Sequence, residues 1–471
     1  MTDEEYFDDE EFKEMLADYE RTVESGQLAF LDADDLADIA DYYQLHDRHD
    51  DAQQAMNRAV ELQPDSIVAL NYQVHEALNC HDYVAAEDYL AQMGDEKAAE
   101  YIFCRAEIWL AQGQGERADQ YLRHCLNDIS EDEYQDFVLD VVNLYTEYGD
   151  SEKGMEWMMR AYPEETDDFK ELMGRTYFGI GAYDDSERIF NELIDRNPFQ
   201  KRYWHELANI QYMKEDYGAS VASSEYAIAI DPSDPEGLMS KANALFRLDN
   251  YEEALMYYER YSAKEPDDEF ALLHQGSCLV NLRRYEEAVV RLKKAEEVAP
   301  VDSSYLADIY QELGFAYSEM NMPETALYYI DKTDDLDCDH NDMQVIRGHI
   351  LLASGRVEEA ESTYKKAIRE SGNSPLIMMR VTVSLYDNQY VEAAYKMFLH
   401  FFKYVDKDWN QGYSYMALCC HDLLRFDEYL YYLKEACRRN PEEAKIALGF
   451  LFPVGMKPQD YYEFAKKKLK K

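Results

Sequence analysis

The sequence has little positive charge: 47 Lys and Arg stand against 97 Asp and Glu in 471 residues, for a formal net charge of -50. Nucleic-acid binding needs a basic surface that displaces counterions from phosphate, so we expect no nucleic-acid partner. Cysteine is scarce too. Its eight residues include no CxxC pair and fit neither a disulfide framework nor a zinc module. We expect these cysteines to be small core residues in a reducing compartment.

Long apolar runs are also missing. Residues 446–452 (IALGFLF) form one of the longest, whereas a helix needs roughly 18–20 apolar residues to span a bilayer. The chain begins with MTDEEYFDDEEF, which is acidic where a secretion signal would be basic and then apolar. These observations predict a cytoplasmic protein without a membrane partner.

The common enzyme motifs are absent. The sequence has no GxxxxGK[ST], no HExxH, no GxSxG and no GxGxxG that opens a helix after a strand. Small His, Cys and Asp clusters occur at residues 46–51 (HDRHDD), 337–340 (DCDH) and 419–422 (CCHD). His46 and His49 have the spacing to share a metal on a helix, but they fall on a predicted turn where polar residues are common. We expect no enzyme, no cofactor and no metal site, with a metal- or ligand-binding enzyme as the alternative.

The negative charge is unevenly distributed. Residues 1–50 carry 18 acidic and three basic residues, whereas residues 444–471 carry seven lysines and two acidic residues. The acidic surface either attracts a basic protein partner, keeps a long chain solvated, or reflects adaptation to high salt. The basic tail KKKLKK either ends a solvated helix near the negative end of its dipole or folds back on an acidic surface.

What the sequence does have is a period of 34 residues. The stretch YEEALMYYERYSAKEP begins at residue 251, and the similar YEEAVVRLKKAEEVAP begins at residue 285. Four prolines are spaced by the same interval: Pro198, Pro232, Pro266 and Pro300. Such self-similarity indicates a repeat architecture in which each unit is one small supersecondary structure.

Residues 235–268 illustrate the predicted unit, a helix, a turn and a second helix. Leu238, Ala242 and Leu245 have the spacing of one helical face. Asp234 and Pro235 supply an N-cap and a proline at the first helical position. The turn is expected at residues 249–250. The second helix has a face formed by Tyr251, Ala254, Tyr258 and Tyr261, and Pro266 is expected to help end it.

Small residues recur where the two helix axes of each unit would come closest. On the second helices these are Ala254, Ala288, Ala326, Ala360 and Ala394. On the first helices they are Gly174, Ala208, Ala242, Gly276, Gly314 and Gly348. This joint pattern resembles the tetratricopeptide repeat family over nearly the whole chain. The resemblance implies an all-α fold, an α-solenoid in which antiparallel helix pairs form a right-handed superhelix.

The repeat frame gives a predicted domain organisation of about twelve units. Their starts fall near residues 33, 67, 99, 135, 167, 201, 235, 269, 307, 341, 375 and 410. We assign residues 1–32 to an acidic N-terminal segment and cap, residues 33–300 to the first eight repeats, residues 301–443 to the last four, and residues 444–471 to a C-terminal capping helix with a basic tail. The insertion VDSSYL at residues 301–306 adds four residues, which we expect to form one extra helical turn or, alternatively, a kink.

The resemblance also implies a concave groove lined by the first helices, with the second, fifth, ninth and twelfth residue of each helix facing a bound peptide. In the repeats that begin at residues 201, 235 and 269, the candidate binding residues are Arg202, His205, Asn209, Tyr212, Met239, Asn243, Phe246, Phe270, His274 and Ser277. A family variant clamps a terminal carboxylate with two lysines, two asparagines and an arginine. Of its five positions only Asn209 agrees here, so we do not expect that clamp.

These features predict a non-enzymatic scaffold or adaptor that binds another protein, as an extended peptide or a helix, in its groove. The alternative within the same class is an acidic chaperone or assembly factor for basic client proteins. The two differ in the salt dependence of binding, because only the second depends mainly on charge.

Overall fold

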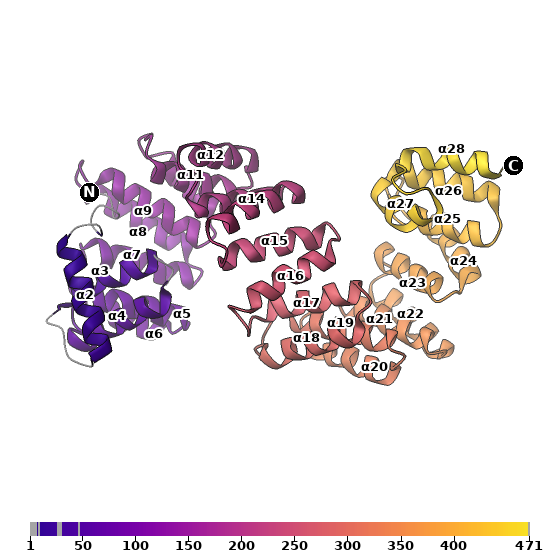
Figure 1. The fold of residues 1–471 in the computed structure, drawn as a ribbon, viewed down its shortest axis with the longest axis horizontal. Coiled ribbons are helices and arrows are strands. Elements are labelled where there is room, and N and C mark those ends of the chain that lie inside the picture. Colours follow the sequence, from indigo (N-terminus) through magenta and orange to yellow (C-terminus); the bar gives the residue numbers. More distant parts are fainter. Residues whose placement is uncertain (1–6, 8–9, 26–30, 46–47, 470–471) are drawn as a thin grey trace. The chain divides into compact units, whose positions relative to one another are not determined.

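The computed structural model describes residue 7 and residues 10–25, 31–45 and 48–469, and within these ranges it contains helices and no strand (Figure 1). The predicted all-α fold class is therefore confirmed. The chain divides into two compact units, residues 1–215 (unit 1) and 216–471 (unit 2). In the described ranges, no helix is both long enough and apolar enough to cross a membrane. The predicted division after residue 300 stays a prediction.

Unit 1 consists of short helices joined by tight turns. They are α2 (Glu10–Ser25), α3 (Ala33–Leu45), α4 (His49–Leu62), α5 (Ile67–Asn79), α6 (Tyr83–Leu90), α7 (Ala99–Ala111), α8 (Gly115–Cys125), η1 (Leu126–Asp128), α9 (Tyr134–Glu147), α10 (Ser151–Met158), α11 (Asp167–Gly179), α12 (Tyr183–Arg196) and α13 (Lys201–Met213).

Unit 2 continues the same alternation. Its helices are α14 (Tyr217–Ile230), α15 (Pro235–Arg247), α16 (Tyr251–Ser262), α17 (Glu269–Asn281), α18 (Tyr285–Val298), α19 (Leu306–Glu319), α20 (Pro323–Asp331), η2 (Lys332–Asp335), α21 (His340–Ala353), α22 (Val357–Glu370), α23 (Pro375–Asp387), α24 (Val391–Phe401), α25 (Tyr413–Asp422), α26 (Phe426–Arg439), α27 (Pro441–Leu448), η3 (Gly449–Leu451) and α28 (Pro458–Leu469).

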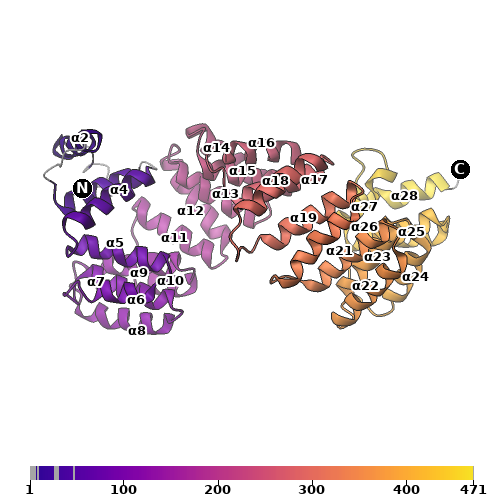
Figure 2. The same cartoon turned by 90° about the horizontal axis from the view of Figure 1, so that it is seen from below.

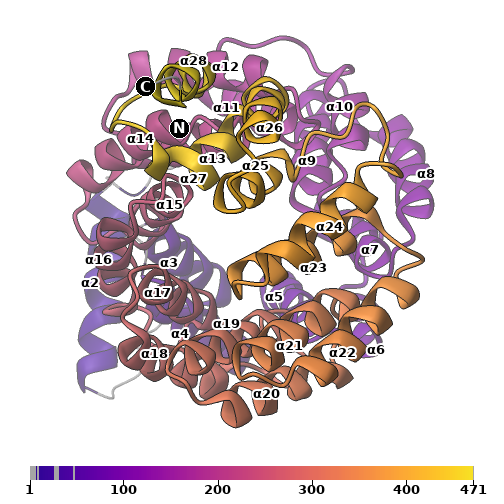
Figure 3. The ribbon, with the colours of Figure 1, turned by 90° about the vertical axis from the view of Figure 1, so that its right-hand side faces the viewer.

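The helices of unit 2 pack as a stack of pairs. Each first helix packs against the second helix of its own pair, as α17 does with α18, and against the second helix of the pair before it. From α17 onward, successive first helices also contact one another, and α19, α21 and α23 lie side by side (Figure 2). In Figure 3 the first helices α17, α19 and α21 lie on the inner side of this unit, and the second helices α18, α20 and α22 lie on its outer side. The first helices therefore share one inner face.

The start of α15 follows the predicted local chemistry. Asp234 is the N-cap, and its carboxylate accepts a hydrogen bond of 2.8 Å from the Gly237 backbone N–H, with Pro235 at the first helical position. Leu238, Ala242 and Leu245 are all buried. The second helix, α16, ends at Ser262, so Pro266 lies four residues beyond the helix and does not end it, contrary to our expectation.

Nearly every turn inside a helix pair contains one residue in the left-handed region of backbone space. These residues are His81, Gly113, Gly149, Gly181, Glu215, Asp249, Arg283, Asn321, Gly355, Gln389 and Leu424. Seven of them carry a side chain, although that region favours glycine. The hydrogen-bonded helices on either side hold the backbone in this conformation. For example, the Arg284 N–H donates to the Leu279 carbonyl across the turn at Arg283.

The recurrent small residues lie where two helices touch, as predicted. The five alanines on second helices are all 0% exposed. On the first helices, a Cβ added to Gly276 would lie 2.4 Å from the Leu292 side chain, and one added to Gly348 would lie 2.3 Å from the Tyr364 ring. Both distances are below van der Waals contact, so the helix axes approach as closely as glycine allows.

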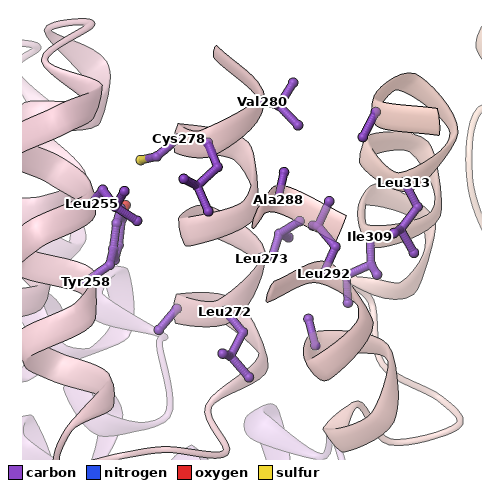
Figure 4. Close-up of a cluster of buried hydrophobic side chains, with 14 of the residues drawn as sticks. Leu255, Tyr258, Leu272, Leu273, Cys278, Val280, Ala288, Leu292, Ile309 and Leu313 are labelled. Atoms are coloured by element: carbon purple, nitrogen blue, oxygen red, sulfur yellow. The ribbon is translucent and has the colours of Figure 1, made fainter. Parts of the chain in front are cut away.

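The largest continuous core of unit 2 joins α15 to α20. Its side chains gather between neighbouring pairs, and Figure 4 shows them between α16, α17, α18 and α19. The labelled residues are Leu255, Tyr258, Leu272, Leu273, Cys278, Val280, Ala288, Leu292, Ile309 and Leu313. Each is less than 9% exposed. The core thus runs from one repeat to the next, as expected for stacked repeats.

The insertion at residues 301–306 does not extend a helix. Helix α18 ends at Val298 and α19 begins at Leu306, so the additional residues lie in the connection. The prediction of an extra helical turn is therefore wrong. Pro300 lies two residues past the end of α18, as Pro198 and Pro232 do after α12 and α14, so α18 ends where the repeat frame expects and the extra residues fall after it. The connection packs back on α17, because the Ser303 hydroxyl donates a 2.9 Å hydrogen bond to Glu269.

Both ends of the chain carry helices that cover apolar side chains. In α2, Phe12 and Tyr19 are buried, and the Tyr19 ring lies 6.4 Å from the ring of Tyr43 on α3. At the other end, α28 packs on α26 and α27, with the ring of Tyr461 stacked 3.8 Å from that of Phe452. Residues 1–6 and 8–9 of the acidic N-terminus, residues 26–30 and the last two lysines lie outside the described residues.

Candidate peptide-binding surface

The clearest candidate surface in unit 2 lies on the inner face of α15, α17 and α19. Helix α17 packs against α19 directly, and the connection at residues 299–305 returns to the start of α17. Side chains from all three helices and from this connection meet there. We call this group the α15–α19 surface: Met239, Asn243, Phe246, Phe270, His274, Ser277, Tyr305, Asp308 and Glu312.

Aromatic side chains form its centre. The His274 ring lies 4.0 Å from the Phe270 ring and 5.4 Å from the Phe246 ring, measured between centroids. The Tyr305 ring lies 5.5 Å from Phe270 in an edge-on arrangement. His274 Nδ1 donates a 2.9 Å hydrogen bond to the Phe270 carbonyl oxygen, and burial lowers the pKa of His274. The imidazole is therefore neutral at physiological pH and is part of an apolar platform.

Two carboxylates on α19 stand beside this platform, one helical turn apart. Asp308 is exposed and near His274, and Glu312 is half-buried and accepts a hydrogen bond from Ser277. Burial raises the pKa of Glu312 to about 7, and the negative charge of Asp308 adds to this effect. Burial also raises the pKa of Asp308. In the described part of the chain neither carboxylate forms an ion pair, so a bound cation would stabilise their charged forms.

Asn243 and Met239 complete the surface on α15. The Tyr258 hydroxyl of α16 donates a 2.6 Å hydrogen bond to Asn243 Oδ1, which fixes the orientation of the amide. Met239 is half-buried against the core below. The candidate residues on α15 and α17 thus lie on one face, as the repeat frame predicted, but their role in binding stays a prediction.

The four candidate residues on α13 belong to unit 1. Arg202 is exposed and forms an ion pair with Glu171 of α11. His205 is only 4% exposed and packs inside unit 1, whereas Asn209 and Tyr212 are half-buried. Burial raises the pKa of Glu171, and the neighbouring Arg202 opposes that shift. Binding roles for these four residues stay predictions as well.

Tyr305, Asp308 and Glu312 were not among the residues chosen from the sequence. Asp308 is the second residue of the repeat that begins at 307, the position that Phe270 holds in the preceding repeat. Applying the same four positions to the repeat that begins at residue 307 would have identified Asp308. Glu312 lies off the four counted positions, but it holds the sixth position, which His274 holds in the preceding repeat. Tyr305 had no such signal, because it lies in the insertion.

The clusters considered for metal binding give three different outcomes. His46 and Asp47 lie outside the described residues. In DCDH, the Cys338 Sγ atom is 3.8 Å from His340 Nδ1. In CCHD, both cysteines are completely buried in the core.

The protonation of Glu312 predicts an unusual dependence of stability on pH. Its pKa of about 7 lies above the value of about 4.3 in an unfolded chain, so the native state binds the proton more tightly. Native stability from this group is present below pH 4 and is lost as the pH rises to 7. Glu312→Gln removes that loss. Relative to the wild type, the free energy of unfolding of the variant should rise by on the order of 2 kcal/mol from pH 4 to pH 8.

Urea unfolding at both pH values measures this difference. The matched control is Glu286→Gln on the outer helix α18, where the side chain is exposed, and its difference from the wild type should not vary with pH. If the two variants behave alike, Glu312 is not held in a desolvated site.

Comparison with known proteins identifies repeats in the same part of the chain. Models of the tetratricopeptide repeat family match residues 172–235, 239–296 and 342–373. The second of these stretches contains α17 and most of α15, which carry the candidate residues of unit 2. No curated protein matches the chain significantly.

Several solved structures are similar at low identity. Yeast Tom70 is 16% identical, with a TM-score of 0.44, over 93% of this chain and 96% of that one. A tetratricopeptide repeat protein from Parabacteroides merdae ATCC 43184 is 11% identical, with a TM-score of 0.40, over 53% of this chain and 96% of that one. MamA (residue 41 to the end) from Desulfovibrio magneticus RS-1 is 17% identical, with a TM-score of 0.35, over 37% and 96%.

Proposed function

The chain is a tetratricopeptide-repeat protein, and from that premise we propose that it is a non-enzymatic scaffold that binds an extended segment or a helix of another protein. The α15–α19 surface is the site we propose for this binding. The observation that carries the proposal is the meeting of an aromatic platform with two carboxylates that form no ion pair in the described part of the chain. Half-buried rings with polar groups beside them are typical of recognition surfaces.

The same surface favours a basic segment as the partner. A lysine or arginine side chain could stack on Phe270 or Tyr305 and place its charge near Asp308 and Glu312. The net charge of -50 would steer such a segment toward the protein. This supports the alternative of an acidic chaperone or assembly factor for basic clients as the finer form of the proposal.

A peptide titration tests the proposal. The probe is a short peptide of alternating leucine and lysine, compared with one in which norleucine replaces lysine, with affinity measured by calorimetry on the full chain. We expect the lysine peptide to bind at least tenfold more tightly, because it neutralises the two carboxylates. Affinity should fall between about 0.01 M and 0.15 M salt, as the screening length shortens from roughly 30 Å to 8 Å.

Matched variants separate the possible outcomes. Asp308→Asn with Glu312→Gln should weaken the lysine peptide tenfold or more, whereas Glu253→Gln with Glu286→Gln removes the same charge from the outer helices and should have little effect. Loss of binding only in Phe246→Ala with Phe270→Ala would support a scaffold that recognises apolar segments. If neither pair of variants changes binding, the proposed surface is wrong.

A further inference from the structure

Three metal-binding groups converge in unit 1, away from the α15–α19 surface. His75 lies on α5, and Cys104 and Glu107 lie on α7, and these two helices pack against each other. One ligand atom from each side chain, the histidine nitrogen, the cysteine sulfur and a carboxylate oxygen, lies within 4.8 Å of the others. In the repeat frame, His75 and Glu107 both hold the ninth position of a first helix.

The two helices present these groups in matched register. Cys104 and Glu107 are three residues apart and so lie on one face of α7. His75 Nε2 is 2.7 Å from Glu107 Oε2, and the Cys104 thiol donates a 2.8 Å hydrogen bond to Asn71 Oδ1. Asn71 is one turn before His75 on α5. Each of the three groups is therefore held by a contact that crosses between the helices.

We propose that His75, Cys104 and Glu107 bind one divalent metal ion, with Zn²⁺ as the best fit. Zinc takes nitrogen, sulfur and oxygen ligands together at about 2.0–2.3 Å, which places the ligand atoms of a tetrahedral site roughly 3.3–3.8 Å apart. The observed separations are compatible with this range, since His75 Nε2 and Glu107 Oε2 are 2.7 Å apart and the three ligand atoms lie within 4.8 Å of one another. Side-chain movements of about 1 Å or less would bring the ligand atoms into this range.

The charges balance when the metal binds. A thiolate and a carboxylate offset the two charges of Zn²⁺, and His75 binds as neutral imidazole. Without metal, burial raises the pKa of Cys104 to about 12, and the hydrogen bond to Glu107 raises the pKa of His75. The other acidic groups near the site are Glu100 on α7 and Glu147 on α9. Binding therefore forms the Zn–S bond and releases the thiol proton to the solvent, together with any proton on His75.

The environment suits a site with three protein ligands. Cys104 is buried, the Glu107 side chain is 16% exposed, and the His75 side chain is 43% exposed, so one flank is open to water for the fourth position. Asn71 can reverse its amide and donate to the thiolate, which makes it a positioning residue for the sulfur. The metal would join two neighbouring repeats.

Cobalt spectroscopy on the full reduced chain tests the proposal. After chelator treatment, Co²⁺ is titrated in, and we expect one ion per chain, intense tetrahedral bands in the visible and a thiolate-to-cobalt charge-transfer band in the near ultraviolet. Binding of cobalt to the metal-free chain should release the thiol proton together with any proton on His75, and Zn²⁺ should then displace the cobalt. His75→Gln and Glu107→Gln should each weaken binding at least a hundredfold, more than the 10–100-fold typical of outer-shell changes.

Controls keep the assignment specific. Cys104→Ala should remove the charge-transfer band, and circular dichroism reports whether its fold is intact. His75→Gln alters a half-exposed side chain and so tests the site with little change to the core. Cys80→Ala with His81→Gln removes an adjacent Cys–His pair in which Cys80 is exposed, and should change nothing. No bound cobalt, a spectrum without the thiolate band, or loss of binding in this control pair would overturn the proposal.

Discussion

Ala288→Glu is expected to lower the free energy of unfolding of the helices around it by on the order of 4 kcal/mol, because it buries an unpaired charge at a helix crossing. Ala288 is 0% exposed and lies on α18 within the core shared with α17 and α19. The facing position on α17 is Gly276, which has no side chain, and even a Cβ there would collide with Leu292. A carboxylate at Ala288 therefore has neither space nor a solvent path.

The matched control for this prediction is Val290→Glu, two residues further along the same helix. Val290 is 66% exposed, so the same charge change there should alter stability by no more than about 0.5 kcal/mol. Amide hydrogen exchange in α16 to α19 measures the local effect, since each repeat depends mainly on its neighbours. If these amides exchanged as slowly in the Ala288→Glu variant as in the wild type, the assigned helix register would be wrong.

Trp157→Ala is expected to lower the free energy of unfolding of unit 1 by about 5 kcal/mol, because loss of a buried tryptophan side chain costs about 3–5 kcal/mol and a hydrogen bond to a charged acceptor is lost with it. Trp157 is 0% exposed, and its indole Nε1 donates a 2.9 Å hydrogen bond to the buried carboxylate of Asp119. Trp157→Phe keeps much of the ring and loses this hydrogen bond to a charged acceptor, so it should cost about 2 kcal/mol. Urea unfolding followed by circular dichroism measures both changes.

The pH dependence separates the hydrogen bond from the packing. Burial alone would raise the pKa of Asp119, but hydrogen bonds from Arg123 and Trp157 outweigh it and lower the pKa. A lowered folded pKa gives stability that is present above about pH 4, the unfolded value, and is lost as the pH falls further. The difference in the free energy of unfolding between Trp157→Phe and the wild type should therefore become smaller as the pH falls below about 4.

Trp204→Phe is the control for this pH dependence of the stability difference. The Trp204 indole donates to the Pro198 carbonyl, which does not titrate, so its effect should not change with pH. If the difference in the free energy of unfolding between Trp157→Phe and the wild type stayed constant down to pH 2, the indole would not stabilise the ionised carboxylate of Asp119.

The repeat architecture was predictable because its signals are local and repeated. The small residues at helix crossings, the cap at Asp234 and the buried stripe on residues 238–245 each depend on contacts within one helix pair. The end of α16 was not predictable from Pro266, since that proline only limits how far a helix can continue. The insertion was mistaken for a helical turn because its length matches one, whereas α18 ends where the repeat frame expects and the extra residues fall after it.

The repeat frame predicted only part of each candidate site. The predicted residues on α15 and α17 do share a face, because one repeat frame generates both helices. Tyr305 reaches Phe270 only because the insertion returns to the start of α17. His75 and the pair on α7 are 29 and 32 residues apart, and only the rotation of each helix decides whether their side chains meet. The repeat frame aligns His75 with Glu107, but the meeting of the Cys104 thiol with both depends on packing.

The left-handed turn residues have a practical consequence. Glutamate, arginine, glutamine and leucine all occupy this conformation, and Leu424 does so with its side chain 71% exposed. Since the neighbouring helices impose the bend, the identity of the residue matters little to it. These corners are therefore regularly spaced attachment points, where a fluorophore or a crosslinker could be placed to measure the distance between chosen repeats in solution.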